Sequence, residues 1–157
     1  MAREGSSAGS VEVRTALGGE VERILGMYEW LFEPPGSVPP GWDPERGRRA
    51  LGRAISSDES AVLVAERGPE LLGFASCYLD LDSVRYGLRC WVEDLAVSPE
   101  HRSQGVGKAL LDGAKGWAEQ RGATHLELDS GEARLDAHRF YEREEPAWKG
   151  LQYSWLL

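Results

Sequence analysis

Two closely spaced glycines lie where a tight turn meets a predicted helix. Residues 98–122 read SPEHRSQGVGKALLDGAKGWAEQRG, and no polar linker separates Gly105 and Gly107 from the amphipathic segment that follows. Backbone N–H groups at a helix N-terminus lack intrahelical acceptors and carry a partial positive charge, so they attract anions. A glycine lets a phosphate approach the backbone, and Arg102 and Lys108 add positive charge. This junction is therefore predicted to bind a pyrophosphate.

Two other phosphate-binding motifs do not fit the same residues. A nucleoside-triphosphate loop needs a Ser or Thr after its Gly-Lys pair to bind magnesium, but Ala109 follows Lys108, and Arg102 occupies the place of the first glycine. A dinucleotide-binding fingerprint needs a third glycine where Leu110 stands, and its helix follows the first strand of the fold. The remaining alternative is structural: the glycines merely let a helix begin close to a strand.

The spacing of apolar residues predicts an α/β (α+β) fold around this junction. Period-two segments indicate strands, and apolar residues three and four apart indicate helices. The predicted order is a strand over 11–16, helices over 20–32 and 44–57, a hairpin over 61–81, a strand over 87–97, the helix after Gly105, a strand over 124–129, a helix over 134–144 and a closing strand over 150–157. Residues 33–42, EPPGSVPPGW, are predicted to form an exposed loop. No repeat or boundary divides the chain, so residues 11–157 are expected to form one domain after a flexible segment over 1–10.

Composition restricts the class of partner. The chain has 157 residues and a formal net charge of -8, which disfavours nucleic acid and anionic membranes and favours a cationic small molecule. Cys77 and Cys90 lie in apolar strand segments and are expected to be reduced core residues, and no metal-ligand spacing is present. The first ten residues lack the apolar stretch of a signal peptide, so a cytoplasmic protein is expected.

Three segments together resemble the GNAT superfamily of acyl-CoA-dependent N-acyltransferases. RSQGVG at 102–107 is similar to its Arg/Gln-x-x-Gly-x-Gly/Ala signature, VEDLAVSPEHRSQGVGKALL at 92–111 to its central motif, and DAHRFYERE at 136–144 to its helix ending in Phe-Tyr. The resemblance covers about residues 11–157 and implies a mixed, mostly antiparallel sheet of about six to seven strands with helices on both faces. One departure is clear, because Glu145 and Pro146 stand where the family usually has Gly and an aromatic residue.

The resemblance implies acetyl-CoA as co-substrate, with no metal. Its diphosphate would contact the backbone of the junction, beside Arg102, at Ser103, Gln104, Gly105, Val106, Gly107 and Lys108. Its pantetheine arm would pair with the strand before the junction, at Leu95, Ala96 and Val97, like an added strand. A backbone N–H near Ala96 would then polarise the thioester carbonyl.

N-acylation also needs a base, because an alkylamine with a pKa of about 10.4 is protonated at neutral pH. Glu93 and Asp94 are adjacent on a predicted strand and are expected to point to opposite faces, so that only one faces the cleft. If Trp91, Glu93, Leu95 and Val97 share a face, burial among apolar neighbours raises the pKa of Glu93 and suits it to this role. Glu93 is therefore the favoured base and Asp94 the second candidate; a carboxylate with no catalytic part is the alternative.

The family position of Tyr141 implies a general acid that protonates the departing thiolate. The predicted enzyme is an N-acetyltransferase in which a primary amine of a small cationic acceptor, such as a polyamine or an aminoglycoside, attacks the thioester directly. Trp30, Phe32 and Trp42, or the acidic pair Asp80 and Asp82, are candidates for contacts with this acceptor. A protein or peptide amino group, an anionic amine bound by the arginines at 46, 49 and 53, and a non-catalytic acyl-CoA-binding module are the alternatives. The apolar end YSWLL could contribute to a homodimer or form an inner strand.

Overall fold

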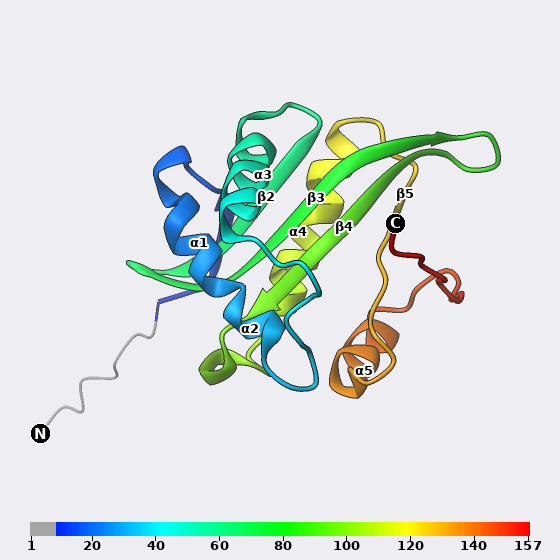
Figure 1. The fold of residues 1–157 in the computed structure, drawn as a ribbon. Helices are drawn as coiled ribbons and strands as arrows, with labels where there is room; N and C mark the ends of the chain where they lie inside the picture. The colour runs from blue at the N-terminus through cyan, green and yellow to red at the C-terminus, as the bar shows by residue number, and fades with distance from the viewer. Residues whose placement is uncertain (1–8) are drawn as a thin grey trace, which may run out of the picture.

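The computed structural model describes residues 9–157. The strands in this range form a single mixed sheet (Figure 1). Five strands lie in the order of the sequence: β1 (Glu12–Thr15), β2 (Ser60–Arg67), β3 (Glu70–Ser83), β4 (Gly87–Val97) and β5 (His125–Glu127). Neighbouring strands from β1 to β4 are antiparallel, whereas β5 is parallel to β4. The expected mixed, mostly antiparallel α/β sheet is confirmed.

Helices cover both faces of this sheet, as the sequence predicts (Figure 1). One face carries α1 (Val21–Met27), α2 (Glu29–Phe32) and α3 (Pro44–Ser56), and the other carries α4 (Val106–Gln120). The last helix, α5 (Leu135–Arg143), follows β5 and lies beside the sheet. Short 3-10 turns at Gly18–Glu20 and Pro99–His101 precede α1 and α4.

Local chemistry explains where the longer helices begin. The side chain of Asp43 accepts a hydrogen bond from the Glu45 backbone, and Pro44 fills the first turn of α3, where its missing N–H costs nothing. α4 has an apolar stripe at helical spacing that is almost completely buried against the sheet: Val106, Leu110, Ala114 and Trp117. This stripe packs α4 on β2, β3 and β4, so the position of its N-terminus is determined by the core.

Two expectations about the fold are corrected. Residues 150–157 form no strand, so the described part of the chain has five strands rather than six or seven. β5 is only three residues long and offers little edge for another strand to pair with, which leaves Leu151, Tyr153 and Trp155 exposed. The helix predicted over 20–32 is divided at Tyr28 into α1 and α2. Residues 1–8 of the segment predicted to be flexible lie outside the described residues.

Candidate active site

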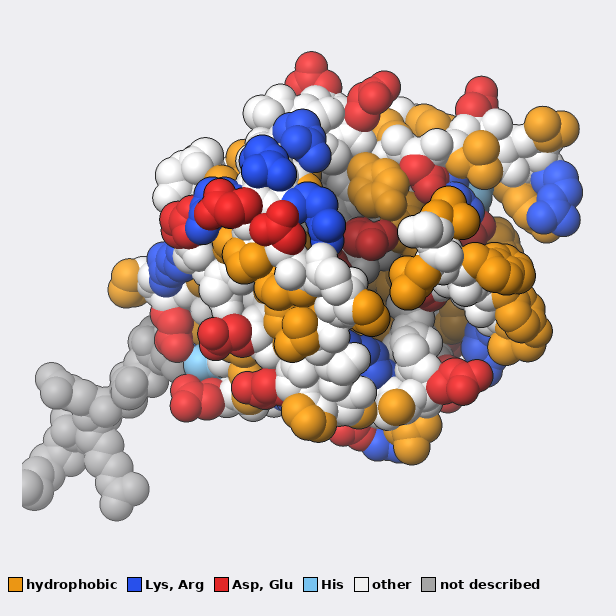
Figure 2. All heavy atoms as spheres, in the orientation of Figure 1, with side chains coloured by type: hydrophobic (Ala, Val, Ile, Leu, Met, Phe, Trp, Pro, Cys, Tyr) orange, Lys and Arg blue, Asp and Glu red, His pale blue; other side chains and the backbone are white. Residues whose placement is uncertain are grey.

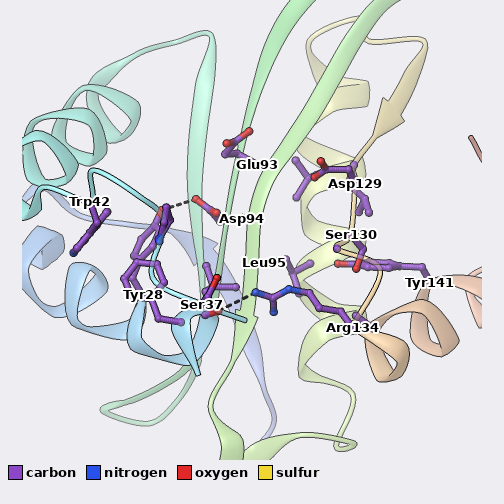
Figure 3. A pocket seen from close by; sticks show the side chains of 17 residues that line it. Tyr28, Ser37, Trp42, Glu93, Asp94, Leu95, Asp129, Ser130, Arg134 and Tyr141 are labelled. Atoms are coloured by element: carbon purple, nitrogen blue, oxygen red, sulfur yellow. Dashed lines mark hydrogen bonds between the residues drawn. The ribbon is translucent and has the colours of Figure 1, made fainter. Parts of the chain in front are cut away.

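A cavity of about 370 Å³ opens between the two halves of the fold (Figure 3). One wall comes from α2 and the proline-rich loop over 33–43, the floor from β4, and the other wall from the segment after β5 and from α5. In the space-filling view it appears as a hollow at the centre of one face, with acidic side chains inside it (Figure 2). Its lining includes Tyr28, Trp42, Glu93, Asp94, Asp129, Arg134 and Tyr141.

Both carboxylates of the Glu-Asp pair line this cavity, so the expectation that only one would face it is wrong. Val92 pairs with Cys77 of β3 and Asp94 pairs with Ser76, which leaves Glu93 as an extra residue in β4. Such a β-bulge interrupts the alternation of side chains along a strand. After the bulge, Leu95 and Val97 pack on the α4 side of the sheet, so they do not share a face with Glu93 as expected.

Asp94 is held by two hydroxyl groups at the cavity floor. Oδ2 accepts a hydrogen bond of 2.7 Å from Tyr28 and one of 3.3 Å from Ser76. Burial raises the pKa of Asp94 and the charge of Glu93 adds to this effect, while the hydrogen bonds from Tyr28 and Ser76 oppose it. A carboxylate with a raised pKa is a better proton acceptor near neutral pH than an ordinary one.

Glu93 lies beside Asp94 but closer to solvent. Its Oε2 accepts hydrogen bonds from the indole N–H of Trp91, at 2.8 Å, and from the Tyr78 hydroxyl, at 3.3 Å. Burial, followed by the charge of Glu93, raises the pKa of Tyr78 to about 12. Glu93 is therefore an exposed, hydrogen-bonded anion at the rim of the cavity and lacks the apolar surroundings that the sequence predicted for it.

Tyr141 points from α5 into the cavity, on the wall opposite Tyr28 (Figure 3). Burial raises the pKa of its phenol; the charge of Arg134 lowers it and that of Asp129 raises it. The phenol is thus protonated at neutral pH, as a general acid must be.

The outer edge of β4 is unpaired beyond Trp91 within residues 9–157. β5 pairs only with Arg89, Cys90 and Trp91, so β4 and the chain after β5 separate next to the cavity. The Ser98 amide donates to the Leu72 carbonyl of β3. Because backbone groups alternate along an antiparallel strand, Ala96 also faces β3, whereas the amides of Leu95 and Val97 face the open edge.

The glycine junction follows this edge directly. Ser103 and Gly105 have φ angles of 60° and 83°, and Gly105 is the residue before the first turn of α4. A left-handed conformation suits a glycine at position 105, and it leaves the amides of Val106, Gly107 and Lys108 free of intrahelical acceptors. The Lys108 side chain, which was expected to add positive charge here, pairs with Asp112 and Glu144, each at 3.1 Å.

Three titratable residues of the cavity were not predicted from the sequence as site residues. Tyr28 reads as an ordinary apolar position of a helix, and Asp129 and Arg134 stand at the end of a predicted strand and at the start of a predicted helix. The position of Asp129 at the end of a predicted strand is the one signal available, since functional residues gather in the loops that follow strands. Phe32 and Trp42 line the cavity as expected, but Trp30 packs in the core, and neither Asp80 nor Asp82 reaches the cavity.

Metal sites and membrane-spanning helices are absent from the described part of the chain. Within 9–157, no group of three or more His, Cys, Asp or Glu side chains is placed to hold a metal ion. None of the helices in this range combines the length and hydropathy needed to cross a membrane. Cys77 and Cys90 are buried free thiols, in agreement with the sequence.

Curated proteins similar in sequence to this chain include N-acetyltransferases. YhfO of Bacillus subtilis, an uncharacterized N-acetyltransferase, is 35% identical over 99 residues, which cover 62% of this chain and 66% of YhfO. Streptothricin acetyltransferase of Streptomyces lavendulae is 34% identical over 95 residues, covering 60% of this chain and 48% of that protein. The chain therefore spans between about half and two thirds of the length of these curated relatives.

Fold and family agree as well. The structure of AAC(6')-Iy with the bisubstrate analogue CoA-S-monomethyl-acetylneamine matches with a TM-score of 0.78 and 18% identity, covering 95% of this chain and 100% of that chain, which shows a common fold. Residues 24–144 match the model of the Acetyltransferase (GNAT) family. The chain belongs to the acetyltransferase (GNAT) family.

Proposed function

We propose that the protein is an acetyl-CoA-dependent N-acetyltransferase that acts on a primary amine of a small cationic molecule. The observation that carries the proposal is one cavity bordered by the open edge of β4, by the carboxylates of Glu93 and Asp94, and by the Tyr141 phenol on the opposite wall. Membership of the family and the names of the relatives support the same reaction.

The residues present suit acetyl-CoA. The amides of residues 103–108, with the side chain of Arg102, would hold its diphosphate, and the main chain of β4 from Leu95 to Val97 would pair with its pantetheine arm. The end of this arm would lie at the cavity, because β4 leads from the cavity-lining residues Asp94 and Leu95 to Val97, where the junction begins. The Leu95 N–H, which faces the open edge, would donate to the thioester carbonyl oxygen and so act as the amide near Ala96 that the family resemblance implies.

Asp94 is proposed as the base and Tyr141 as the acid. The amine nitrogen attacks the thioester carbonyl carbon, its proton passes to Asp94 directly or through Glu93 or water, and the carbon–sulfur bond breaks. The Tyr141 hydroxyl donates a proton to the departing thiolate. Asp94 replaces Glu93 as the favoured base because it is the carboxylate whose pKa burial raises at the cavity floor.

The cavity favours a small cation as acceptor. Three carboxylates line it, and Tyr28, Phe32 and Trp42 form an aromatic wall, with the Tyr28 and Trp42 rings stacked at a centroid distance of 6.2 Å. Aromatic faces and carboxylates together bind ammonium groups. The names of streptothricin acetyltransferase and of the aminoglycoside enzyme AAC(6')-Iy point to acceptors of this kind. The arginines at 46, 49 and 53 are not part of the lining, which disfavours an anionic amine.

The altered segment after α5 does not weaken the case for an enzyme over a binding module. Glu145 has a φ of 54°, so it adopts the left-handed conformation in which a glycine is unstrained. Trp148 stacks on Tyr86 with ring centroids 5.3 Å apart, and neither residue lines the cavity. The departure from the family pattern is thus absorbed away from the proposed site.

A homodimer is proposed for the exposed apolar end of the chain. Leu151, Tyr153, Trp155, Leu156 and Leu157 are all exposed, and large exposed apolar patches mark contact surfaces. Sedimentation of the full chain against a variant lacking residues 151–157 tests this assembly separately from the activity. A monomeric full chain would contradict it.

Acceptor screening tests the activity. Free thiol released from acetyl-CoA is measured with polyamines, aminoglycosides, an aminoalkylphosphonate, amino acids and a lysine-containing peptide. Turnover with a polyamine or an aminoglycoside is expected. Turnover with the peptide alone would replace the small acceptor by a protein amino group, and cofactor binding without turnover on any amine would favour the binding module.

A further inference from the structure

Arg134 joins the two walls of the cavity. It precedes α5 on one wall, and its Nη2 donates a hydrogen bond of 2.8 Å to the carbonyl oxygen of Leu31 in α2, on the other wall (Figure 3). These residues lie 103 positions apart in the sequence. Leu31 lies in the last turn of α2, where a carbonyl lacks an intrahelical donor, so Arg134 satisfies a group that the helix leaves unpaired.

The loop after α2 is shaped around this contact. Gly36 folds back so that its amide donates to the Glu33 carbonyl at 2.7 Å. A Cβ at position 36 would overlap the Leu31 carbonyl oxygen and would lie 2.6 Å from Nη2 of Arg134. A glycine at position 36 therefore lets α2, the loop and the guanidinium meet at one point.

We propose that Arg134 is a positioning residue, a clasp that holds the Leu31–Gly36 wall of the acceptor cavity against the N-terminus of α5. Tyr141 lies seven residues after Arg134, which is about two helical turns, so the same helix carries the clasp and the proposed acid. The clasp thus fixes the distance between the wall that contacts the acceptor and the phenol that completes the reaction. This inference rests on the proposed acetyl transfer.

The charge of Arg134 gives the clasp a second effect that can be measured. It lowers the pKa of Asp94 and that of Tyr141. The groups that face Asp94 are Tyr28 and Ser76, which donate to it, and the anion Glu93 beside it. Loss of the guanidinium removes positive charge from this set, so Asp94 would ionise only at higher pH.

The test compares Arg134→Met with Arg134→Lys and with Arg139→Met. Methionine keeps the apolar stem without the donor, and lysine keeps a donor and the charge. Arg139→Met is the matched control, because it removes an exposed cation that pairs with Asp136 on the same helix. Hydrogen exchange of residues 29–43 reports on the wall, and kcat, KM and the pH profile report on the reaction.

Arg134→Met is expected to speed amide exchange at Glu33 and Gly36 and to lower kcat about tenfold or more, since small misplacements are costly in catalysis. Its acidic limb of kcat/KM moves to higher pH, while acetyl-CoA affinity is kept; lysine restores part of each effect and the control changes none. Unchanged exchange would show that no clasp forms, and faster exchange with unchanged kcat, KM and pH profile would remove its positioning role. If the wild type shows no turnover on any acceptor, both the proposed function and the positioning role fail. Hydrogen exchange still shows in that case whether Arg134 holds the wall in place, because it does not depend on turnover.

Discussion

The phenol of Tyr28 and the carboxylate of Asp94, 66 residues apart in the sequence, share a hydrogen bond of 2.7 Å across the floor of the cavity. The bond joins the turn between α1 and α2 to the bulged part of β4. The same ring stacks on Trp42 and packs against Phe74 of the core. The aromatic wall for the acceptor and the proposed base are therefore fixed to each other by one side chain.

Replacing Tyr28 by Phe keeps the ring and removes this donor. The hydrogen bond lowers the pKa of Asp94, so its loss raises that pKa further and leaves less base ionised at a given pH. The acidic limb of kcat/KM is expected to move to higher pH, and the protein to lose about 1.5–3 kcal/mol of stability, the usual range for a hydrogen bond to a charged group. A pH–rate profile identical to that of the wild type would show that Tyr28 does not tune the base.

Asp94→Asn is expected to lower kcat by about 10²–10⁴-fold, because that is the usual contribution of a general base. The same substitution should increase the stability of the folded protein. The pKa of Asp94 is raised in the folded state, so its ionised form destabilises the fold at neutral pH, and this penalty disappears as the pH falls through the raised pKa. Thermal unfolding should therefore give a higher Tm for the variant at pH 7 and a smaller difference at low pH.

Glu93→Gln is the matched comparison for this carboxylate pair. The charge of Glu93 raises the pKa of Asp94, so its removal should move the acidic limb of kcat/KM to lower pH with most of kcat retained. A loss of kcat in Glu93→Gln as large as expected for Asp94→Asn, with Asp94→Asn active, would exchange the two roles and restore the assignment made from the sequence.

Gly105→Ala should weaken acetyl-CoA binding. No atom lies within 4 Å of the added Cβ, but the φ of 83° at this position is unfavourable for any residue with a side chain. Strain of about 1–2 kcal/mol is expected to shift the loop and to raise the Kd measured by calorimetry by about 5- to 30-fold. Gly116→Ala, in the middle of α4 and also free of close neighbours, is the control and should leave the Kd unchanged. Equal affinity in both variants would remove the junction from the binding site.

Glu145→Gly should stabilise the fold. Glu145 has a φ of 54°, which costs about 1–2 kcal/mol for a residue with a side chain, against about 0.5–1 kcal/mol of added chain entropy for glycine. The Tm is expected to rise by about 2 °C, while Glu145→Ala, which keeps a Cβ, gives no gain. A lower Tm in the glycine variant would mean that the Glu145 side chain makes a contribution larger than the backbone strain.

The sequence predicts the parts of the site that depend on local patterns. The run from Glu93 through the glycines to Lys108 and the Phe140-Tyr141 pair are each contiguous, so spacing alone places them on a strand, a turn and two helices. The bulge at Glu93 depends instead on the register with β3, which no pattern within β4 reveals. The bulge is the reason why Asp94 is proposed as the base in place of Glu93.

Contacts between segments that lie far apart in the chain could not be predicted from local sequence patterns either. Tyr28 and Arg134 reach the cavity only because the fold brings α1, α2 and α5 together. The closing strand expected over 150–157 has the right alternation but finds only the three residues of β5 at that edge of the sheet. An alternating pattern alone therefore does not form a strand; a neighbouring strand must also be long enough to pair with it.

The most direct test of the proposed acetyl transfer compares wild-type protein with Tyr141→Phe. Free thiol released from acetyl-CoA is measured with a polyamine or an aminoglycoside as acceptor, and the affinity for acetyl-CoA is measured for both proteins. We expect turnover by the wild type and a loss of about 10²-fold or more in kcat for the variant at unchanged acetyl-CoA affinity. Equal turnover by the two proteins would remove Tyr141 from the reaction, and failure of the wild type to bind acetyl-CoA would contradict the proposed function.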